Sequence, residues 1–387
     1  MYTISQYGNM YMNKARINAY ARALRQVITP NSIVLDIGAG TGIFALLACR
    51  YGARRVYAIE REDAINLARE MAAANGYSDR FACIQSLSTK VALPERVDAI
   101  ISDLSAMLPL FGQHIPAIID ARDRFLAPGG VLIARQDHLR ASIVEAPDCY
   151  RKLTEPWKNL FGLNLSAGWP LVANTLRSLT SKRLKLLTPP SNLAVLDYRT
   201  IADSNMDTQL VWSMHQTGTG HGVAVWFDRI VADGIKISNE PGAPKAVSTS
   251  DIYGQAFFPW PNPVELEPGD RIVFRIKADL VKDEYTWRWE TLVSSAEEGQ
   301  RTKAQFRQSS LHGYPLSLES LKKREAEYIP PPNDDTRINA FILSKIDGNT
   351  SLRHIAHALT VKFPLRFNRW QDAMSRVGDI VVQYSEQ

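Results

Sequence analysis

The stretch Val34-Leu-Asp-Ile-Gly-Ala-Gly-Thr-Gly-Ile-Phe44 decides how the rest of this chain is interpreted. The apolar run at 33–37 is typical of a buried parallel strand, and residues 43–52 continue as an apolar helix. Glycines between them allow a sharp turn and a close approach of a ligand to the backbone. The sequence therefore predicts a strand, a ligand-binding turn and a helix whose first N–H groups are free.

The spacing of these glycines, Gly38, Gly40 and Gly42, separates two classes of nucleoside ligand. A dinucleotide fingerprint has the pattern Gly-x-Gly-x-x-Gly, with a pyrophosphate on the helix N-terminus. Here the third glycine comes one residue early, and Asp36 precedes the first glycine by two residues. A carboxylate at that place suits a ligand that has no phosphate and presents an ammonium group. The methionine part of S-adenosyl-L-methionine has this chemistry.

Two further charged residues fit the same ligand. Glu60 ends the strand expected at 55–60, where a carboxylate can accept hydrogen bonds from both ribose hydroxyls. Alone it would be a solvated glutamate, but the glycine turn before it favours a binding role. Arg16 lies on a helix expected within residues 1–30. A solvated arginine is the ordinary interpretation, and the functional one is a guanidinium that takes the cofactor's carboxylate.

The composition is that of a globular protein with two or three domains. The chain has 387 residues, which is long enough for two or three hydrophobic cores. Of these residues 45% are hydrophobic and 22% are charged, as in ordinary globular proteins. Its net charge of +5 is too small and too scattered to indicate nucleic-acid binding. The three cysteines lie far apart on apolar stretches, which argues against a disulfide framework or a metal site. Because no leader and no apolar run of ~18 residues is found, we expect a cytoplasmic protein without a membrane partner.

The order of the patterns predicts three parts. Strand and helix patterns alternate from 33 to 145, as in a Rossmann-like α/β domain. The strand at 97–101 runs to Asp103, and because chemistry sits at such carboxyl ends, Asp103 is a candidate catalytic acid. Beyond about residue 150, short segments alternate apolar with polar residues and indicate an antiparallel β-barrel or sandwich. The expected boundaries are 1–148 for the α/β domain, 149–328 for the β domain, 329–336 for a linker and 337–387 for a small, mainly helical, winged-helix-like module.

Residues 7 to about 310 resemble the protein arginine methyltransferases. The match begins at Met10-Tyr-Met-Asn-Lys-Ala-Arg16, which is similar to the family's cofactor-covering helix, and continues through the glycine turn to Val97–Asp103. Residues 157–166 are similar to the start of the family's dimerisation arm, which the resemblance places at about 155–185. The resemblance implies an S-adenosyl-L-methionine-dependent methyltransferase with S-adenosyl-L-homocysteine as product. It also implies a protein or peptide substrate, a β-barrel after the α/β domain, and a homodimer.

The resemblance also implies the residues of the site. In the family, two glutamates on one hairpin clamp the target guanidinium. This chain has Asp103 at the first place and Gly112, with Gln113 beside it, at the second, so Asp103 and Gln113 are the candidate catalytic residues. The family's Thr-His-Trp loop is Asp251-Ile252-Tyr253 here. The implied cofactor-binding residues are Met10, Arg16, Asp36, Gly38, Gly40, Gly42, Glu60, Ser88 and Thr89, the last standing where the family often has an acid near the adenine amine.

The missing second acid bears on specificity. An arginine side chain is always protonated in the cell, so its methylation needs two carboxylates that hold the cation and orient one nitrogen. One aspartate supplies at most half of that geometry. We therefore expect the family's fold and cofactor, but little or no activity on generic arginine-rich peptides. A catalytically silent homologue that binds peptides and a small-molecule methyltransferase are the alternatives.

The tail from about residue 335 resembles PqqD-like modules, which bind leader segments of ribosomally made peptides. The resemblance rests on Ile346-Asp-Gly-Asn-Thr-Ser-Leu-Arg-His-Ile-Ala-His-Ala-Leu, which matches their Asp-Gly helix junction. Helical spacing predicts three helices, and no strand hairpin is expected before them. The resemblance implies that the tail binds a peptide segment.

Overall fold

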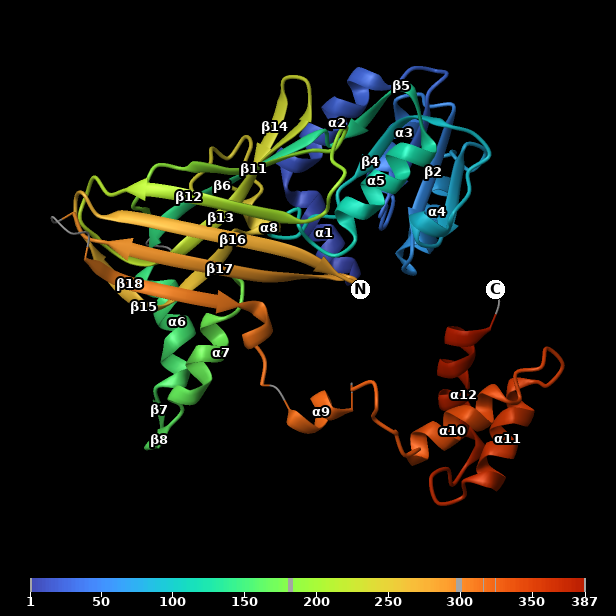
Figure 1. Cartoon of the computed structure of the whole chain (residues 1–387). Helices are drawn as coiled ribbons and strands as arrows, with labels where there is room; N and C mark the ends of the chain where they lie inside the picture. Colours follow the sequence, from blue (N-terminus) through green and yellow to red (C-terminus); the bar gives the residue numbers. More distant parts are fainter. Residues whose placement is uncertain (1, 180–183, 297–300, 316, 324, 386–387) are drawn as a thin grey trace. The chain divides into compact units, whose positions relative to one another are not determined.

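The computed structural model describes residues 2–179, 184–296, 301–315, 317–323 and 325–385 (Figure 1). These residues form two compact units, Met1–Pro315 and Leu316–Gln387. The larger unit contains both a parallel and an antiparallel part. Its parallel part holds the glycine turn.

The parallel part is a five-stranded sheet with the strand order β3-β2-β1-β4-β5. This order brings the carboxyl ends of β1, β2 and β4 next to one another, so that Asp36, Glu60 and Asp103 come from adjacent strand ends. The strands are β1 (Ile33–Ile37), β2 (Arg55–Glu60), β3 (Phe81–Gln85), β4 (Val97–Ser102) and β5 (Leu126–Ile133). The helices are α1 (Ile4–Met12), α2 (Lys14–Val27), α3 (Ile43–Arg50), α4 (Ala64–Ala74) and α5 (His114–Phe125).

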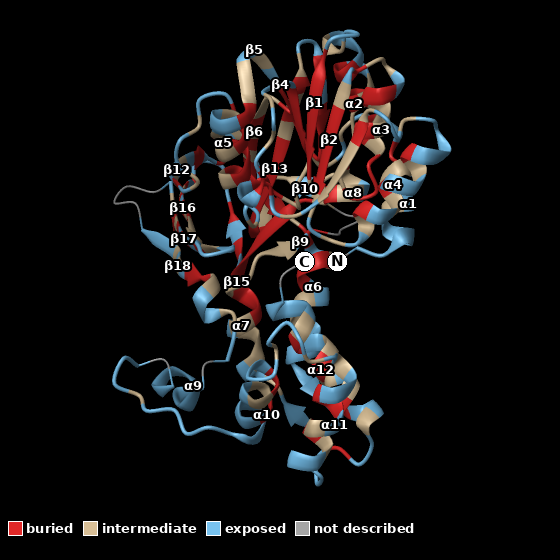
Figure 2. Cartoon of the chain, turned by 90° about the vertical axis from the view of Figure 1, so that its right-hand side faces the viewer, coloured by how far each residue is buried: buried red, intermediate tan, exposed pale blue. Residues whose placement is uncertain are grey.

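Burial explains why the apolar runs form this sheet. All five residues of β1 are buried, and Figure 2 shows the buried residues gathered in the central strands. Alternate side chains point to opposite faces. Leu35 joins the core that extends into the antiparallel part, and Val34 joins the core formed with α2, α3 and α4. The strand therefore stabilises two apolar layers at once, as expected of a parallel strand covered on both faces.

One expected feature differs in the structure. The single helix expected in residues 1–30 is two helices, because Asn13 has an extended backbone and its side chain caps α2 by accepting from Arg16 N. Strand β5 is irregular, since it contains Pro128-Gly129-Gly130. There Gly129 has φ +79°, and the pairing with β4 shifts register, so the strand continues through a local irregularity.

The antiparallel part consists of two sheets whose edges are joined. Thr208 on β12 donates to the carbonyl of Leu193 on β11, and Gln308 on β18 donates to that of Pro259 on β15. Trp287 and Trp289, which alternate on β17, are buried between the sheets. One sheet contains β6 (Gln136–Glu145), β9 (Arg177–Ser178), β10 (Lys185–Leu186), β11 (Ser191–Asp197), β13 (Gly218–Ala232), β14 (Ile235–Ser238) and β15 (Ala256–Leu266). The other contains β12 (Met206–Ser213), β16 (Arg271–Val281), β17 (Glu284–Ser294) and β18 (Thr302–Ser309).

The antiparallel pairing starts earlier than the boundary expected at residue 148. Strand β6 begins at Gln136 and pairs with both β11 and β13. It follows β5 so closely that the chain passes from one sheet to the other without a linker. The parallel and antiparallel parts therefore share an interface, and a buried cluster of polar side chains lies in it.

A short arm projects from the antiparallel part in Figure 1. It contains α6 (Pro147–Thr154), α7 (Trp169–Ala173) and between them a hairpin of β7 (Asn159–Leu160) and β8 (Leu163–Asn164). The hairpin exposes 53% of Leu160, 95% of Phe161 and 64% of Leu163. Such a cluster of exposed apolar side chains is typical of an interaction site.

The smaller unit is helical. The three helices expected there are α10 (Asp334–Leu343), α11 (Leu352–Lys362) and α12 (Trp370–Tyr384), and a short α9 (Leu318–Lys322) precedes them. Their core includes Ile338, Ile342, Ile355 and Leu359. Within the described residues of this unit no strand is found, so it lacks a winged helix's strands there. The resemblance to PqqD-like modules stays a prediction.

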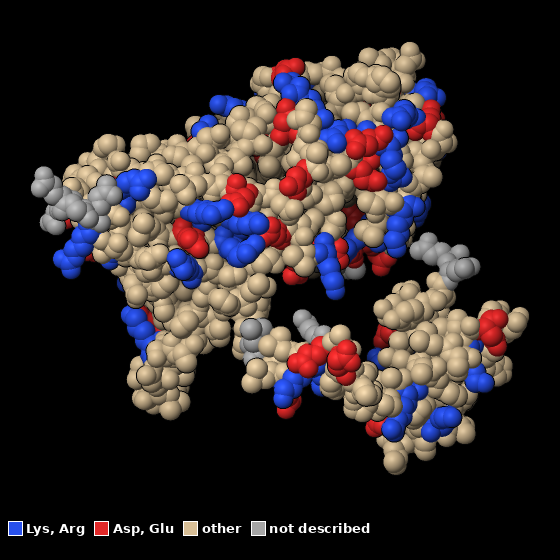
Figure 3. All heavy atoms as spheres, viewed as in Figure 1, with Lys and Arg blue, Asp and Glu red and all other residues tan. Residues whose placement is uncertain are grey.

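The surface carries charges of both signs. Lysine and arginine side chains are interspersed with aspartate and glutamate on the face shown in Figure 3. Among the helices that the structure describes, none combines the length and the apolar character needed to cross a membrane.

Candidate functional site

The glycine turn is covered by the first helix. Gly38, Gly40 and Gly42 have φ values of +68°, +55° and +82°, which favour glycine. The ring of Tyr7 on α1 lies against Gly40, where an added Cβ would be 2.6 Å from the ring's Cε1. The hydroxyl of Tyr11 on the same helix contacts that of Thr41. Neither tyrosine was expected to take part in this site.

Two carboxylates flank the turn. Asp36, at the end of β1, is buried and accepts a hydrogen bond from Ala45 N at 3.1 Å. Burial raises the pKa of Asp36 to about 7, although the Ala45 N–H lowers it in part. Among the described residues it has no cationic partner. Glu60 accepts from Gly40 N and from Glu62 N, each at 3.0 Å.

Arg16 connects this turn to the end of β4. Its Nε donates to Asp103 Oδ2 at 2.6 Å, and its guanidinium carbon lies 4.8 Å from the ring centre of Phe44. Its Nη1 is buried and has no hydrogen-bond partner in the described part of the chain. A buried donor without an acceptor is costly, and a bound ligand is one way in which such a donor is satisfied.

Asp103 is buried among three donors. Oδ1 accepts from Arg229 Nη1 at 2.7 Å, Oδ2 accepts from Arg16 Nε, and the hydroxyl of Tyr253 lies 2.8 and 2.7 Å from the two oxygens. Burial alone would raise the pKa of Asp103. The two guanidiniums outweigh it and hold the pKa at about 2. The carboxylate is therefore ionised at every physiological pH and is already paired.

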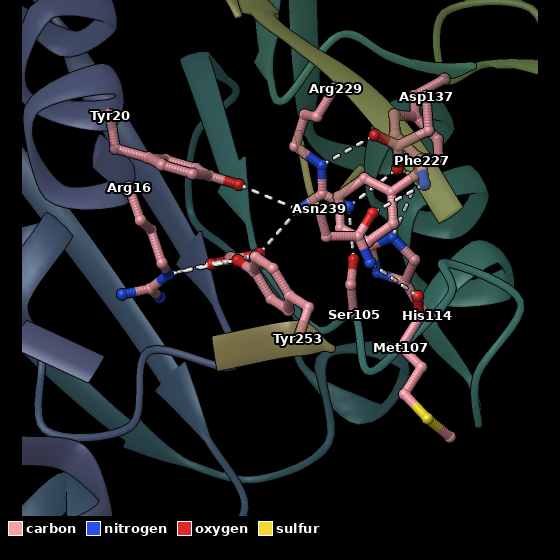
Figure 4. Close-up of polar contacts among 12 residues, drawn as sticks. Arg16, Tyr20, Ser105, Met107, His114, Asp137, Phe227, Arg229, Asn239 and Tyr253 are labelled. Carbon is pink, nitrogen blue, oxygen red and sulfur yellow. Dashed lines mark hydrogen bonds and ion pairs between the residues drawn. The ribbon is translucent and has the colours of Figure 1, made fainter. Parts of the chain in front are cut away.

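The arginine that pairs with Asp103 also binds a second acid. Arg229 on β13 donates from Nε and Nη2 to the two oxygens of Asp137 on β6, at 2.8 and 2.7 Å (Figure 4). Neither side chain is exposed to solvent. The same guanidinium donates to Tyr20 Oη at 3.2 Å and contacts the hydroxyl of Ser105. The sequence did not predict this pair, because the two residues are 92 positions apart and neither belongs to a recognisable motif.

The cluster continues to a neutral histidine. Tyr198 donates to Asp137 Oδ2 at 2.5 Å, and its hydroxyl lies 3.2 Å from Nε2 of His114 on α5. Burial and the nearby Arg229 lower the pKa of His114 to about 4. This histidine is therefore uncharged at neutral pH. Tyr198 and His114 are two further residues that sequence reasoning missed.

The other expected site residues lie apart from this cluster. Gln113 is exposed, and its Nε2 donates to the carbonyl of Lys282, in the turn between β16 and β17, at 2.5 Å. Gly112 has φ +48°. Met10 is half-buried on α1. After β3, Ser88 is buried and Thr89 exposed. Gln113 therefore does not join Asp103, since its side chain binds the barrel turn instead.

The segment Asp251-Ile252-Tyr253 contacts both Asp103 and Asn13. It lies in α8 (Ser250–Tyr253), whose Tyr253 contacts Asp103. Asp251 accepts from the side chain of Asn13 at 2.5 Å. The loop thus holds the junction between α1 and α2 against the antiparallel part.

Sequence comparisons identify related proteins. Residues 20–146 match the family model of ribosomal protein L11 methyltransferase (PrmA). A probable protein arginine N-methyltransferase 6 of Arabidopsis thaliana is 30% identical over 230 residues, 57% of this chain and 52% of the relative. Protein arginine N-methyltransferase 1 of Saccharomyces cerevisiae is 26% identical over 273 residues, 68% of this chain and 77% of the relative. The chain spans about half the length of the first relatives that it matches.

Structural comparisons agree with this. The Trypanosoma brucei PRMT1 enzyme–prozyme heterotetrameric complex with AdoHcy contains a chain with a TM-score of 0.70 and 21% identity. The match covers 78% of this chain and 97% of that one. Arabidopsis thaliana protein arginine methyltransferase 10 gives a TM-score of 0.66 at 21% identity, with 79% and 97% covered. The expected resemblance and the expected methyltransferase fold followed by antiparallel sheets are confirmed.

Proposed function

We propose that this chain, a relative of the protein arginine methyltransferases, is an S-adenosyl-L-methionine-dependent methyltransferase that modifies a protein or peptide. One observation carries the proposal: complementary groups surround the glycine turn. Among the described residues, Asp36 is a buried carboxylate without a cation and Arg16 Nη1 is a buried N–H without an acceptor, and Glu60 places a carboxylate at the tip of β2. The names of the relatives, and the AdoHcy in one of the structural neighbours, support the same cofactor.

These groups match the polar ends of the cofactor. Asp36 would hold its ammonium group, Arg16 Nη1 its carboxylate and Glu60 its ribose hydroxyls, with Met10, Ser88 and Thr89 beside them. When bound, the cofactor supplies an electrophilic methyl group on a sulfonium. The chain's own part is to align the acceptor and to exclude water, which matter more here than a strong base. We place the protein in the cytoplasm.

Loss of the ribose acceptor tests the pocket. Glu60→Ala leaves the ribose hydroxyls without their partner and should weaken binding of S-adenosylhomocysteine by about 2–3 kcal/mol. Isothermal titration calorimetry measures the change, with Glu70→Ala, an exposed acid on α4, as the matched control. If Glu60→Ala and Arg16→Ala both bind like the parent, the pocket lies elsewhere.

The arm supports a second proposal, that the chain forms a homodimer. Phe161 and Leu163 would dock on the α/β part of another copy, giving a two-fold assembly. Phe161→Glu with Leu163→Glu should weaken the dimer at least about 100-fold, since burying each apolar side chain contributes about 1.5–3 kcal/mol. Light scattering at micromolar concentration should show monomers for this variant and dimers for Leu365→Glu, an equally exposed residue of the smaller unit. A monomeric parent would rule the dimer out.

One observation favours a second candidate function. Because Asp103 is already ion-paired, the chain could bind cofactor and peptide without transferring a methyl group. Transfer of a tritiated methyl group to a peptide separates the two functions. Rebuilding the two-glutamate clamp does not, because Gly112 has φ +48° and a glutamate there would strain the turn.

A further inference from the structure

The guanidinium of Arg229 lies between two carboxylates from different parts of the fold. Asp137 on β6 binds two of its nitrogens in a bidentate pair, and Asp103 after β4 binds the third at 2.7 Å. Two carboxylates that hold one guanidinium through paired hydrogen bonds are what a site for a substrate arginine needs. In this chain the arginine in that arrangement is its own (Figure 4).

The arrangement leaves no access for a second guanidinium. The side chain of Asp103 is 5% exposed, and those of Arg229 and Asp137 are not exposed at all. Three donors, from Arg16, Arg229 and Tyr253, surround the Asp103 carboxylate. A substrate arginine could therefore reach Asp103 only by displacing one of them.

The charge of the cluster also disfavours a cation. Arg16 and Arg229 are balanced by Asp103 and Asp137, so the four ionised side chains have no net charge. An incoming guanidinium would find no unpaired negative charge here and would be repelled by the two resident ones. His114, the titratable group behind them, is neutral and buried. A neutral or anionic acceptor needs no carboxylate partner, so the occupied carboxylates do not exclude it.

On these grounds we propose that Arg229 holds the place of an acceptor guanidinium, so that this chain methylates an uncharged or anionic group of its substrate. The proposal rests on the methyltransferase function proposed above and adds the acceptor class. The acceptor atom forms its bond to the methyl carbon with its own lone pair as the carbon–sulfur bond breaks and the sulfur keeps that electron pair. A neutral acceptor then releases one proton to water, and a carboxylate releases none.

Binding of ethylguanidinium, which has the head group of an arginine side chain, tests the proposal. We expect the parent, saturated with S-adenosylhomocysteine, to show no binding at millimolar concentrations. Arg229→Ala vacates the space between Asp103 and Asp137 and should bind the probe at least about 100-fold more tightly, with a rise in melting temperature, since each charge-assisted pair is a strong one. Arg275→Ala, which removes an exposed arginine paired with Asp207, should behave like the parent.

A second variant keeps the test decisive if Arg229→Ala does not fold. Arg229→Ser, purified in the presence of ethylguanidinium, leaves Asp103 and Asp137 both charged and free to bind the probe. The proposal is overturned if the parent binds ethylguanidinium as tightly as the variants, if folded variants do not bind it, or if the parent methylates arginine peptides. If ethylguanidinium binds the variants and raises their melting temperature, but neither they nor the parent bind S-adenosylhomocysteine, Arg229 still occupies the place of a guanidinium. The proposed methyltransferase function is then wrong, and the placement of Arg229 is not.

Discussion

Asp137→Ala is expected to lower the free energy of unfolding by about 3–5 kcal/mol, the cost of leaving one member of a buried ion pair without its partner. The pair with Arg229 is bidentate, and neither side chain reaches solvent. The substitution also leaves the hydroxyl of Tyr198 without its acceptor. Urea unfolding followed by circular dichroism measures the change, and the slope of the transition shows whether the unfolded reference state is unaltered.

The control for this experiment is an exposed pair on the same part of the fold. Asp207→Ala breaks the Arg275 pair on β12 and β16, where both side chains are at least 42% exposed, and should cost no more than about 1 kcal/mol. Replacing Asp137 and Arg229 together by leucine should lower the free energy of unfolding less than Asp137→Ala does. The double replacement removes both charges of the pair, so neither is left buried without its partner. If Asp137→Ala behaves like Asp207→Ala, the buried pair does not hold the two parts of the larger unit together.

Binding of S-adenosylhomocysteine is expected to weaken about tenfold for each pH unit below about 7. Burial raises the pKa of Asp36 to about 7 in the unliganded chain, so at lower pH the carboxyl must lose a proton before it can pair with the ligand's ammonium group. Because the folded-state pKa is raised, this group's contribution to stability is complete below its usual pKa and is lost as the pH rises through about 7. Ligand binding offsets that loss.

Calorimetry between pH 5 and 8 measures this dependence. At pH 6 the Asp36 carboxyl of the parent should release close to one proton for each ligand bound. Titrations in buffers of different ionisation enthalpy measure this number of protons. Asp36→Asn should bind weakly at every pH and release none. An affinity that is constant over this range would show that Asp36 does not receive the ammonium group.

The features of this fold that the sequence could predict are those with local signals. The strands at 33–37 and 55–60 were predicted with the bounds that the structure gives, because each is a short, mainly apolar run between turn residues. The glycine turn and the acids at strand ends follow from the same runs. Parallel strands end at one edge of a sheet, so the sequence alone places Asp36, Glu60 and Asp103 together.

The Arg229–Asp137 pair could not be predicted in this way. Each residue lies next to other polar residues on its strand, Asp137 between Gln136 and His138 and Arg229 after Asp228, so the sequence pattern does not show which side chain faces solvent. Whether it faces solvent depends on what the sheet packs against. Because β6 follows β5 directly, that face is covered by the α/β part, and the charges had to pair within the interface. Gln113 was predicted at the site because it follows Gly112. Its side chain donates to the carbonyl of Lys282 instead and does not reach Asp103.

A crystal structure of the chain grown with S-adenosylhomocysteine is the most decisive test of the proposed function. We expect the ligand at the carboxyl ends of β1 and β2, with its ammonium group on Asp36, its carboxylate on Arg16 Nη1 and its ribose hydroxyls on Glu60. Arg229 should still lie between Asp103 and Asp137. A glycine turn that stays empty at saturating ligand, or a ligand bound with none of these three contacts, would contradict the claim that this chain is an S-adenosylmethionine-dependent methyltransferase.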